Sequence, residues 1–552
     1  MAKRLLVGRP LSSAEADHQR LPKKIALATF SSDPISSTAY ATEEILFVTA
    51  VGASSLALGL DKLVPMAIAV AALLAIVVAS YRQTIYAYPS GGGAYIVSRE
   101  NLGEYPSLVA AASLLVDYIL TVAVSVSAGV AALLSLDAFH GIEQHRVALC
   151  LFFVALLTAG NLRGLKESGT IFAAPTYIYI TVLSAMVVYG LIRVFFGDID
   201  PVPFDAERAE DVTQAGGSLS LFLVLRGFSS GAVALSGVEA ISNGVPAFRR
   251  PESRNAATTL TVMGFILGTL FLGVSILARQ LGPYPTHEET VISQLGRAVF
   301  GPGPLHTLLQ FATAGILVLA ANTAYVDFPR LASIVARDGY LARQFANQGD
   351  RLVFSNGILF LAVAASALLV AFGGLTTLLI PLYAVGVFTS FTLSQSGMVR
   401  HHLRLKERGW QRGVVINAVG AVATCVVLVI VAGSALFGFV QEYRAAGAVA
   451  ALKRRLSLTA RVRRDGRVES IAVAHVVAGD VVLLAAGNLV PADGGILEAD
   501  NFLVTEAALT GESLPVEKRP GVVAEAATLA ERTNLVFSGT SGRSGTATVL
   551  VG

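Results

Sequence analysis

The sequence predicts an all-α membrane protein followed by a small all-β domain. Its 552 residues are 54% hydrophobic and only 14% charged, whereas about a quarter of the residues in a soluble domain are charged. Apolar runs close to the length of a helix that crosses about 30 Å of hydrocarbon recur along the chain as far as residue 440. After Gly438 the sequence changes to short β-rich stretches punctuated by glycine. Most of the chain is therefore expected in lipid.

The apolar runs number eleven and account for almost all of the membrane part. They lie around residues 25–50, 62–81, 106–134, 146–160, 171–195, 219–243, 257–279, 305–326, 356–372, 374–397 and 414–440. Every second loop between them carries most of the arginine and lysine. These loops are "YRQTIYAYPSGGGAYIVSREN", "NLRGLKES", "FRRPESRN", "RLASIVARDGYLARQFANQGDR" and "MVRHHLRLKERGWQR". The positive-inside rule places them, and the basic N-terminal segment 1–24, in the cytoplasm.

Charge and cysteine content exclude several partners. The 41 basic and 38 acidic residues nearly cancel, so nothing favours a nucleic acid partner. Cys150 and Cys425 lie far apart inside apolar runs, which argues against a disulfide or a thiolate metal site. The N-terminal segment lacks the apolar core and cleavage site of a secretory signal, so we expect it to stay in the cytoplasm.

The first and sixth runs are interrupted by similar sequences, "SSDPISSTAYATEEI" at 31–45 and "SSGAVALSGVEAI" at 229–241. A separation of five segments inverts the orientation in the membrane, so the match predicts an inverted repeat of five plus five helices with the first helix of each half broken. Broken helices expose backbone groups that lipid cannot satisfy, so they normally line a cavity. The alternative is that Pro34 and Gly231 only kink two helices.

Two aspartates fall inside the apolar runs, and both are candidates for function. An ionised carboxylate at the centre of a membrane helix costs about 2.5–3.5 kcal/mol, so it normally faces the protein interior or a water-filled site. Asp33 lies at the first break and Asp117 near the middle of the third run. The structural alternatives are that Asp33 caps the half-helix after the break and that Asp117 pairs with Arg226.

Hydroxyl groups accompany these aspartates at helical spacing. Thr121 and Ser125 follow Asp117 by one and two turns, so three oxygens share one helical face. Tyr40 follows the first break, and Ser236 precedes Gly237 in the second. Hard cations such as potassium bind oxygen donors, although such hydroxyls also join helices. The glycine cluster in "YPSGGGAYIVSREN" at 88–101 is not followed by the lysine of a phosphate loop, and we expect a flexible hinge or re-entrant turn there.

Five long motifs resemble the KimA-type potassium importers of the KUP family, within the amino acid–polyamine–organocation superfamily. They are "SSDPISSTAYATEEIL", "YRQTIYAYPSGGGAYIVSRENLGE", "SLLVDYILTVAVSVSAG", "SGVEAISNGVPAFRRPESRNAA" and "LIPLYAVGVFTSFTLSQSGM". The resemblance covers residues 1 to about 433. It implies a twelve-helix, LeuT-like permease of five-plus-five inverted topology that imports potassium with protons and works as a homodimer. We also expect no cofactor.

The resemblance also implies a site. Potassium would be bound by Asp33, Tyr40, Asp117, Thr121, Ser125, Ser236 and Tyr383. Asp33 and Asp117 would also couple protons. Members of the superfamily that carry amino acids have a glycine-rich first break whose amides hold a carboxylate, whereas acids and hydroxyls dominate here; an amino acid permease is therefore the alternative function.

The C-terminal part resembles the actuator domain of P-type ATPases. Its short strands surround the sequence "TGES", formed by Thr510, Gly511, Glu512 and Ser513. In that family the glutamate positions water to hydrolyse a phospho-aspartate. The aspartate of a "DKTGT" sequence does not occur in the printed sequence, so we expect Glu512 to be an orphaned group and the chain to be a transporter rather than an enzyme. A fragment of a cation pump is the second alternative function.

The expected organisation has four parts. These are a cytoplasmic segment 1–24, a permease 25–433, a linker helix 434–456 that resembles the second membrane helix and stalk of a pump, and an actuator-like domain 457–552. Eleven crossings from a cytoplasmic start would leave residue 440 outside, although actuator domains work in the cytoplasm. We therefore expect a fusion or junction artefact near residues 430–438, in a multi-pass protein of a bacterial-type inner membrane.

Overall fold

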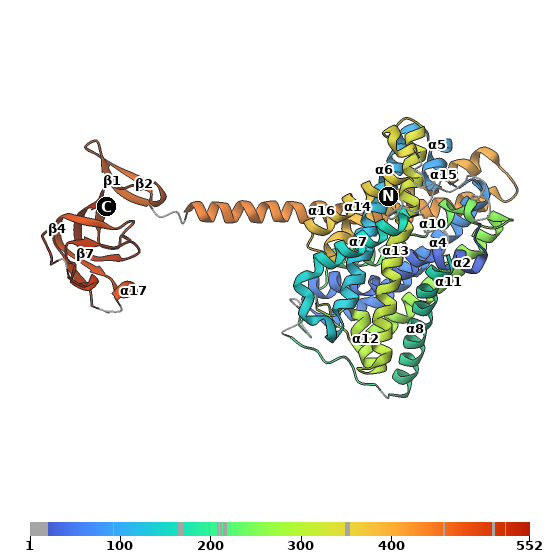
Figure 1. Ribbon diagram of the computed structural model, residues 1–552, viewed down its shortest axis with the longest axis horizontal. Coiled ribbons are helices and arrows are strands. Elements are labelled where there is room, and N and C mark those ends of the chain that lie inside the picture. The colour runs from blue at the N-terminus through green and yellow to red at the C-terminus, as the bar shows by residue number, and fades with distance from the viewer. Residues whose placement is uncertain are drawn as a thin grey trace, which may run out of the picture. The chain divides into compact units, whose positions relative to one another are not determined.

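The computed structural model describes residues 20–552 except positions 92, 164–168, 198, 207–208, 210–211, 214–217, 287, 348–353, 456–458, 511–513 and 525. It divides into a helical unit, Met1–Leu436, and a second unit, Phe437–Gly552. The helical unit forms a bundle of long helices (Figure 1). Its α-helices are α2 Lys23–Ser36, α3 Ala41–Leu46, α4 Leu56–Ala87, α5 Gly93–Asn101, α6 Glu104–Leu134, α7 Arg146–Leu162, α8 Gly169–Phe196, α9 Leu221–Gly231, α10 Ala240–Asn243, α11 Glu252–Leu281, α12 Val291–Phe300, α13 Pro304–Arg337, α14 Ser355–Ala371, α15 Thr376–Leu405 and α16 Trp410–Arg455.

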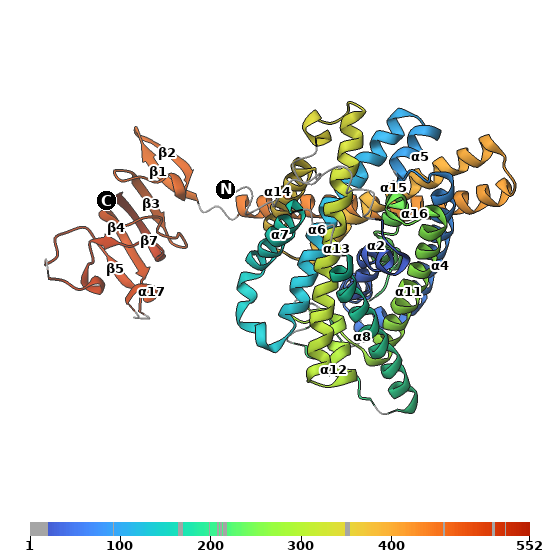
Figure 2. The ribbon, with the colours of Figure 1, turned by 45° about the vertical axis from the view of Figure 1, so that its right-hand side comes forward.

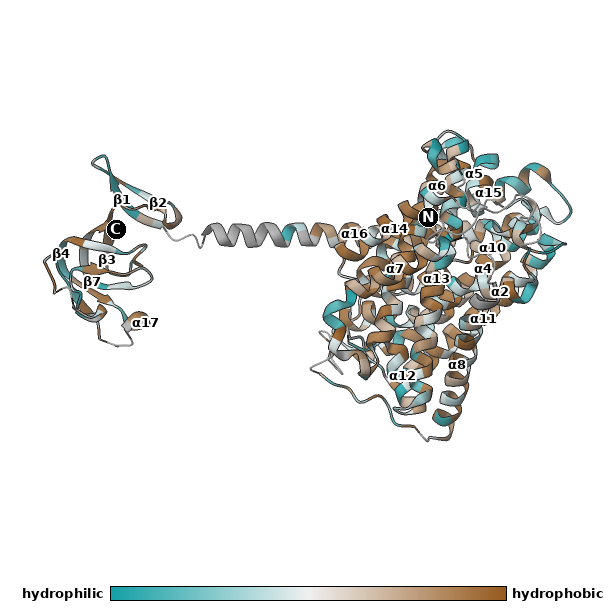
Figure 3. Ribbon diagram, viewed as in Figure 1, coloured by the Kyte–Doolittle hydropathy of each residue, from teal (hydrophilic) through white to brown (hydrophobic). Residues whose placement is uncertain are grey.

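The helical unit matches the predicted membrane architecture. Within the described residues, nine helices are long and apolar enough to cross a membrane. Together with the broken first helix and the shorter α14, they correspond to the eleven apolar runs of the sequence. Hydrophobic residues cover the middle of the bundle and hydrophilic ones gather towards its ends (Figure 3). Large apolar side chains such as Phe265 and Val422 are exposed on the outside, where lipid is the solvent that they meet.

The first helix is broken four residues later than the sequence indicated. Pro34 and Asp33 lie inside α2, and the chain then forms a 3₁₀ turn at Ser37–Ala39 before α3 begins. The side-chain hydroxyls explain the break. Ser36 Oγ donates to the Asp33 carbonyl at 2.7 Å and Ser37 Oγ to the Pro34 carbonyl at 2.5 Å, which takes acceptors that the next helical turn would use. Asp33 is therefore not the cap of the second half-helix.

The sixth segment is broken in the same way. It unwinds after Gly231 into a 3₁₀ turn at Ala232–Leu235, and Ser236 is extended. Gly237 has a φ of +76°, a conformation that glycine adopts most readily. Ser37 Oγ also donates to the Ala234 carbonyl at 3.0 Å. The two breaks thus touch each other, as the expected inverted repeat requires.

The described basic loops gather at one end of the bundle. The Asp338 carboxylate accepts hydrogen bonds from the Tyr95 hydroxyl at 2.7 Å and from Arg99. The Arg404 guanidinium donates to the Glu100 carbonyl at 3.2 Å. Residues 93–101 form helix α5 rather than the hinge or re-entrant turn that we expected. The positive-inside rule predicts that this end is cytoplasmic, and α12 lies at the other end of the unit (Figure 2).

The second unit is an antiparallel sheet with its own hydrophobic core (Figure 2). Its strand order is β2-β1-β3-β7-β4-β5, with β6 also paired to β4. The strands are β1 Thr459–Arg464, β2 Arg467–Ala472, β3 Val481–Ala485, β4 Gly494–Thr505, β5 Val516–Lys518, β6 Leu535–Val536 and β7 Ser541–Val551, and a short helix α17 spans Ala507–Thr510. Asp465 and Gly466, between β1 and β2, both have positive φ, the geometry of an Asp-Gly hairpin turn.

Residues 434–456, which the sequence marked as a linker helix, mostly continue the last helix of the bundle. Helix α16 runs without interruption from Trp410 to Arg455. The boundary between the two units falls inside this helix, after Leu436. A strand begins at Thr459.

Candidate functional site

The two broken helices and α6 bring three buried carboxyl groups together. The exposed fractions of Asp33, Asp117 and Glu239 are 5%, 1% and 2%. The carboxyl groups of Asp117 and Glu239 lie side by side, and Asp33 is within electrostatic range of both. Asp33 packs tightly on the second break, because a Cβ added at Gly237 would lie 2.5 Å from Asp33 Oδ2. The sequence predicted two of these three acids.

Hydroxyl groups from four elements adjoin the acids. Thr121 Oγ1 on α6 donates to the Tyr383 hydroxyl on α15 at 3.2 Å. The Ser236 hydroxyl lies beside those of Tyr40 and Tyr383. Ser125, one turn beyond Thr121 on α6, is also buried. All seven residues proposed from the sequence are thus buried, and contacts or charge interactions connect Asp33, Asp117, Tyr40, Ser236, Thr121 and Tyr383.

Two carboxyl oxygens of this cluster lack a hydrogen-bond partner among the described residues. They are Asp117 Oδ1 and Glu239 Oε2. Buried polar groups are normally satisfied, so a group of orphaned oxygens indicates a ligand or a bound proton. Two adjacent carboxyl groups in a low-dielectric region can both stay ionised only if a bound cation compensates their charge; otherwise one of them holds a proton.

The acids have no basic partner in the part of the chain that the structure describes. Neither Asp33, Asp117 nor Glu239 takes part in a salt bridge there. The alternative that Asp117 pairs with Arg226 is therefore wrong. Within the described ranges, no three His, Cys, Asp or Glu side chains have the arrangement of a metal-ion site. Carboxylate and hydroxyl oxygens such as these are usual ligands of hard cations.

Sequence reasoning missed three residues of this region. Glu239 lies in the quoted stretch "SSGAVALSGVEAI", and the argument that singled out Asp117 applies equally to it. Asp327 is buried on α13, within electrostatic range of Asp33 and Glu239. It falls one residue beyond the apolar run assigned to 305–326, so its burial could not be foreseen. Thr323, one turn earlier on α13, lies beside the Asp33 carboxyl.

A small cavity adjoins the cluster on the side away from the basic loops. Its volume is about 40 Å³, and its lining includes Tyr40, Glu43 and Glu44 together with Thr290 and Thr313. This volume exceeds the roughly 10–15 Å³ needed for one water molecule. Since Tyr40 both lines the cavity and interacts with the acid cluster, the cavity lies next to the candidate site.

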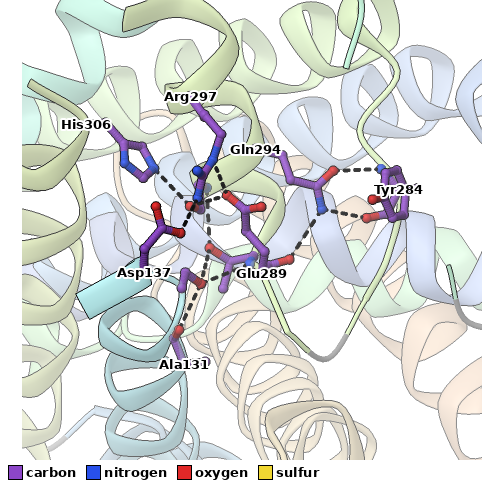
Figure 4. Close-up of polar contacts among 10 residues, drawn as sticks. Ala131, Asp137, Tyr284, Glu289, Gln294, Arg297 and His306 are labelled. Atoms are coloured by element: carbon purple, nitrogen blue, oxygen red, sulfur yellow. Dashed lines mark hydrogen bonds and ion pairs between the residues drawn. The ribbon is translucent and has the colours of Figure 1, made fainter. Parts of the chain in front are cut away.

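Helix α12 lies at this outer end and is held by a polar network (Figure 4). Arg297 binds the carboxylates of Glu289 at 3.2 Å and Asp137 at 3.3 Å, and Ser293 Oγ lies 3.0 Å from His306 Nε2. The backbone amide of Val291 donates to Glu43 Oε2 at 3.0 Å. The start of α12 is therefore connected directly to a residue that lines the cavity.

Only the first residue of the "TGES" sequence lies within the described part of the chain. Thr510 is the last residue of α17, whereas Gly511, Glu512 and Ser513 lie outside the described residues. The proposed role of Glu512 as an orphaned group therefore stays a prediction.

Comparison with known proteins divides the chain within helix α16, which also contains the boundary between the two structural units. The amino acid permease family model matches residues 25–443, and the P-type ATPase actuator domain model matches residues 454–552. The potassium transporter KimA of Bacillus subtilis is 49% identical over 426 residues, which cover 77% of this chain and 69% of that protein.

The relatives of the second unit are much longer proteins. A probable cation-transporting P-type ATPase of Mycoplasma genitalium is 43% identical over 114 residues, or 13% of its length. The cation-transporting ATPase pma1 of Synechocystis is 43% identical over 106 residues, or 12% of its length. The chain thus spans about an eighth of these pumps.

Proposed function

We propose that this chain, a multi-pass membrane transporter that belongs to the amino acid permease family, takes up potassium together with protons. The observation that carries the proposal is the cluster of Asp33, Asp117 and Glu239, buried between two broken helices without a basic partner among the described residues. The likeness to a protein named for potassium transport supports the choice of ion.

The acid cluster gives a physical basis for coupling. With its carboxyl groups ionised and no cation bound, the site would carry uncompensated negative charge inside the membrane, which is costly. Potassium alone neutralises part of this charge, and a proton on a second carboxyl neutralises more. The occluded state is then accessible mainly when both cations are present. Asp33 and Asp117, which we propose as the proton-coupling residues, and the adjacent Glu239 supply the carboxyl groups.

The hydroxyl groups complete the proposed potassium site. Tyr40, Thr121, Ser125, Ser236 and Tyr383 would supply neutral oxygens that replace the hydration shell of the ion. We propose that the protein needs no cofactor, acts as a homodimer in the lipid bilayer and has no nucleic acid partner. Its location would be the inner membrane of a bacterial-type cell.

Growth of a bacterium deficient in potassium uptake tests the ion assignment. Expression of the chain should restore growth at low potassium, and labelled amino acids should not accumulate in proteoliposomes that contain it. Accumulation of an amino acid without any effect of potassium would favour the alternative permease function.

We further propose that these 552 residues do not hydrolyse ATP by themselves. Incubation with γ-labelled ATP should leave the purified chain without acid-stable label, and a labelled phosphoenzyme would contradict this. We also propose that the permease and actuator-like parts were joined near residues 430–438. Sequencing of the source DNA across this region tests the junction, and an uninterrupted permease or pump gene there would overturn it.

A further inference from the structure

One buried acid next to the cluster has no part in the proposed potassium site. Asp327 is 4% exposed and lies on α13 within electrostatic range of Asp33, Glu239 and the Tyr118 hydroxyl. It differs from the three central acids in having a basic partner within the described part of the chain. Arg330 Nη1 lies 3.4 Å from Asp327 Oδ1.

These groups form a series along one face of α13. Thr323, Asp327 and Arg330 follow each other at spacings of four and three residues, which place them on the same side of a helix. At a rise of about 1.5 Å per residue, Asp327 lies about 6 Å beyond Thr323 along the axis and Arg330 about 10 Å beyond it. Thr323 lies beside the Asp33 carboxyl, so the series begins at the acid cluster.

The series leads towards the cytoplasmic end. Helix α13 ends at Arg337, and Asp338 then contacts Tyr95 and Arg99 among the basic loops. The side chain of Arg330 is 38% exposed, compared with 4% for Asp327. Exposure therefore increases in the direction that an imported proton must travel.

We propose that Asp327 accepts the imported proton from Asp33, with Thr323 between them, and releases it towards the cytoplasm beside Arg330. The inference rests on the proposed proton-coupled uptake. In this step the O–H bond of the Asp33 carboxylic acid breaks, a new O–H bond forms on the Asp327 carboxylate, and Asp33 becomes ionised. Arg330 stabilises the ionised form of Asp327 and thereby favours release of the proton to water.

The role can be separated from potassium binding by two assays on the same proteoliposomes. Potassium–rubidium exchange at equal pH needs no net proton transfer, whereas acidification of the lumen during net potassium influx does. In Asp327→Asn we expect exchange within about twofold of the parent and proton influx lower by at least about 100-fold, the lower range for loss of a proton-transfer group. Asp327→Glu should retain proton influx, and Asp61→Asn, at a half-exposed acid near the other end, should change neither assay.

Three results would overturn the inference. The first is equal loss of exchange and proton influx in a folded Asp327→Asn protein, which would make Asp327 a structural or binding residue. The second is unchanged proton influx, and the third is failure of Asp327→Glu to restore it. If the parent protein shows exchange of potassium but no proton influx, the proposed coupling itself is wrong rather than the relay.

Discussion

At the scale of single residues, the proposed chemistry depends on three buried carboxyl groups that have no basic partner among the described residues. Asp117 is the most completely buried of the central acids, and its Oδ1 has no hydrogen-bond partner there. Asparagine has nearly the same shape but no charge. Replacing the aspartate by asparagine therefore isolates the contribution of the charge. A hydrogen bond to a charged group contributes about 1.5–3 kcal/mol.

We therefore expect Asp117→Asn to reduce potassium uptake by about 10- to 100-fold. The measurement is the initial rate of rubidium uptake in cells deficient in potassium uptake, normalised to the amount of protein in the membrane. Asp61→Asn serves as the control. Uptake within twofold of the parent in Asp117→Asn would remove this residue from the site.

Gly237 is a second residue whose role follows from geometry. Its φ of +76° is unfavourable for other residues, and an added Cβ would lie 2.5 Å from Asp33 Oδ2 and 3.0 Å from Pro34. Left-handed backbone costs an alanine about 1–2 kcal/mol, and the displaced carboxyl adds to the effect.

We expect Gly237→Ala to lower uptake at least about tenfold while the protein still reaches the membrane. Gly301→Ala is a matched control for the uptake assay. Gly301 also has positive φ, but an added Cβ there would have nothing within 4 Å. Equal uptake in the two variants would show that the contact with Asp33 is unimportant.

At the scale of elements, the cytoplasmic end depends on a contact between α5 and the end of α13. Hydrogen bonds from Arg99 and Tyr95 hold the pKa of Asp338 below its ordinary value. Because this pKa is lower in the folded protein, the contact stabilises the fold at pH values above the pKa of about 3.9 in the unfolded chain. This stabilisation is lost only as the pH falls through the pKa of the folded state. The contact should thus be insensitive to pH between about 5 and 8.

Asp338→Asn should loosen α5 without unfolding the bundle. Because the pair is partly exposed, we expect at most about 1 kcal/mol, or about a fivefold faster amide exchange in residues 93–101. Hydrogen exchange followed by mass spectrometry measures this. Protection that collapses in the parent between pH 8 and pH 5 would contradict the assigned ionisation.

Most helices of the membrane part could be predicted from the sequence, because a helix that crosses lipid needs a long apolar run. All eleven apolar runs became helical segments, and both interrupted runs became broken helices. Positions of the breaks were less predictable, since they depend on hydroxyls that bond to carbonyls three residues earlier, as Ser37 does. Helix α5 was missed because glycines 91–93 suggested flexibility, although its residues pack against α6 and α15.

The site was predictable where charge stands out against apolar sequence. Asp33 and Asp117 were found for that reason, and Glu239 carries the same signal. Thr323 and Asp327 could not be placed from the sequence, because their closeness to Asp33 results from packing of α13 on α2, nearly 300 residues away in the chain. Such pairings are determined by tertiary structure rather than by local pattern.

At the scale of the whole molecule, the two units have separate hydrophobic cores. The match to the permease family ends at residue 443, inside α16. All residues of the proposed site belong to the helical unit. A chain that ends after Tyr443 therefore contains every group that the proposed transport requires.

We expect this shortened chain to restore growth at low potassium as well as the full chain does, within about twofold per molecule in the membrane. Rubidium uptake per molecule is the measurement, with Asp117→Asn in the shortened chain as the control for impaired uptake. Loss of uptake in a correctly inserted shortened protein would show that the second unit is required for transport.

In the proposed transport cycle, the buried acids bind potassium and a proton together. Proteoliposomes that contain a pH indicator and receive an inward potassium gradient, with the membrane potential clamped, test this most directly. We expect acidification of the lumen that depends on potassium and is at least about tenfold slower in Asp117→Asn. Potassium entry without acidification would contradict it.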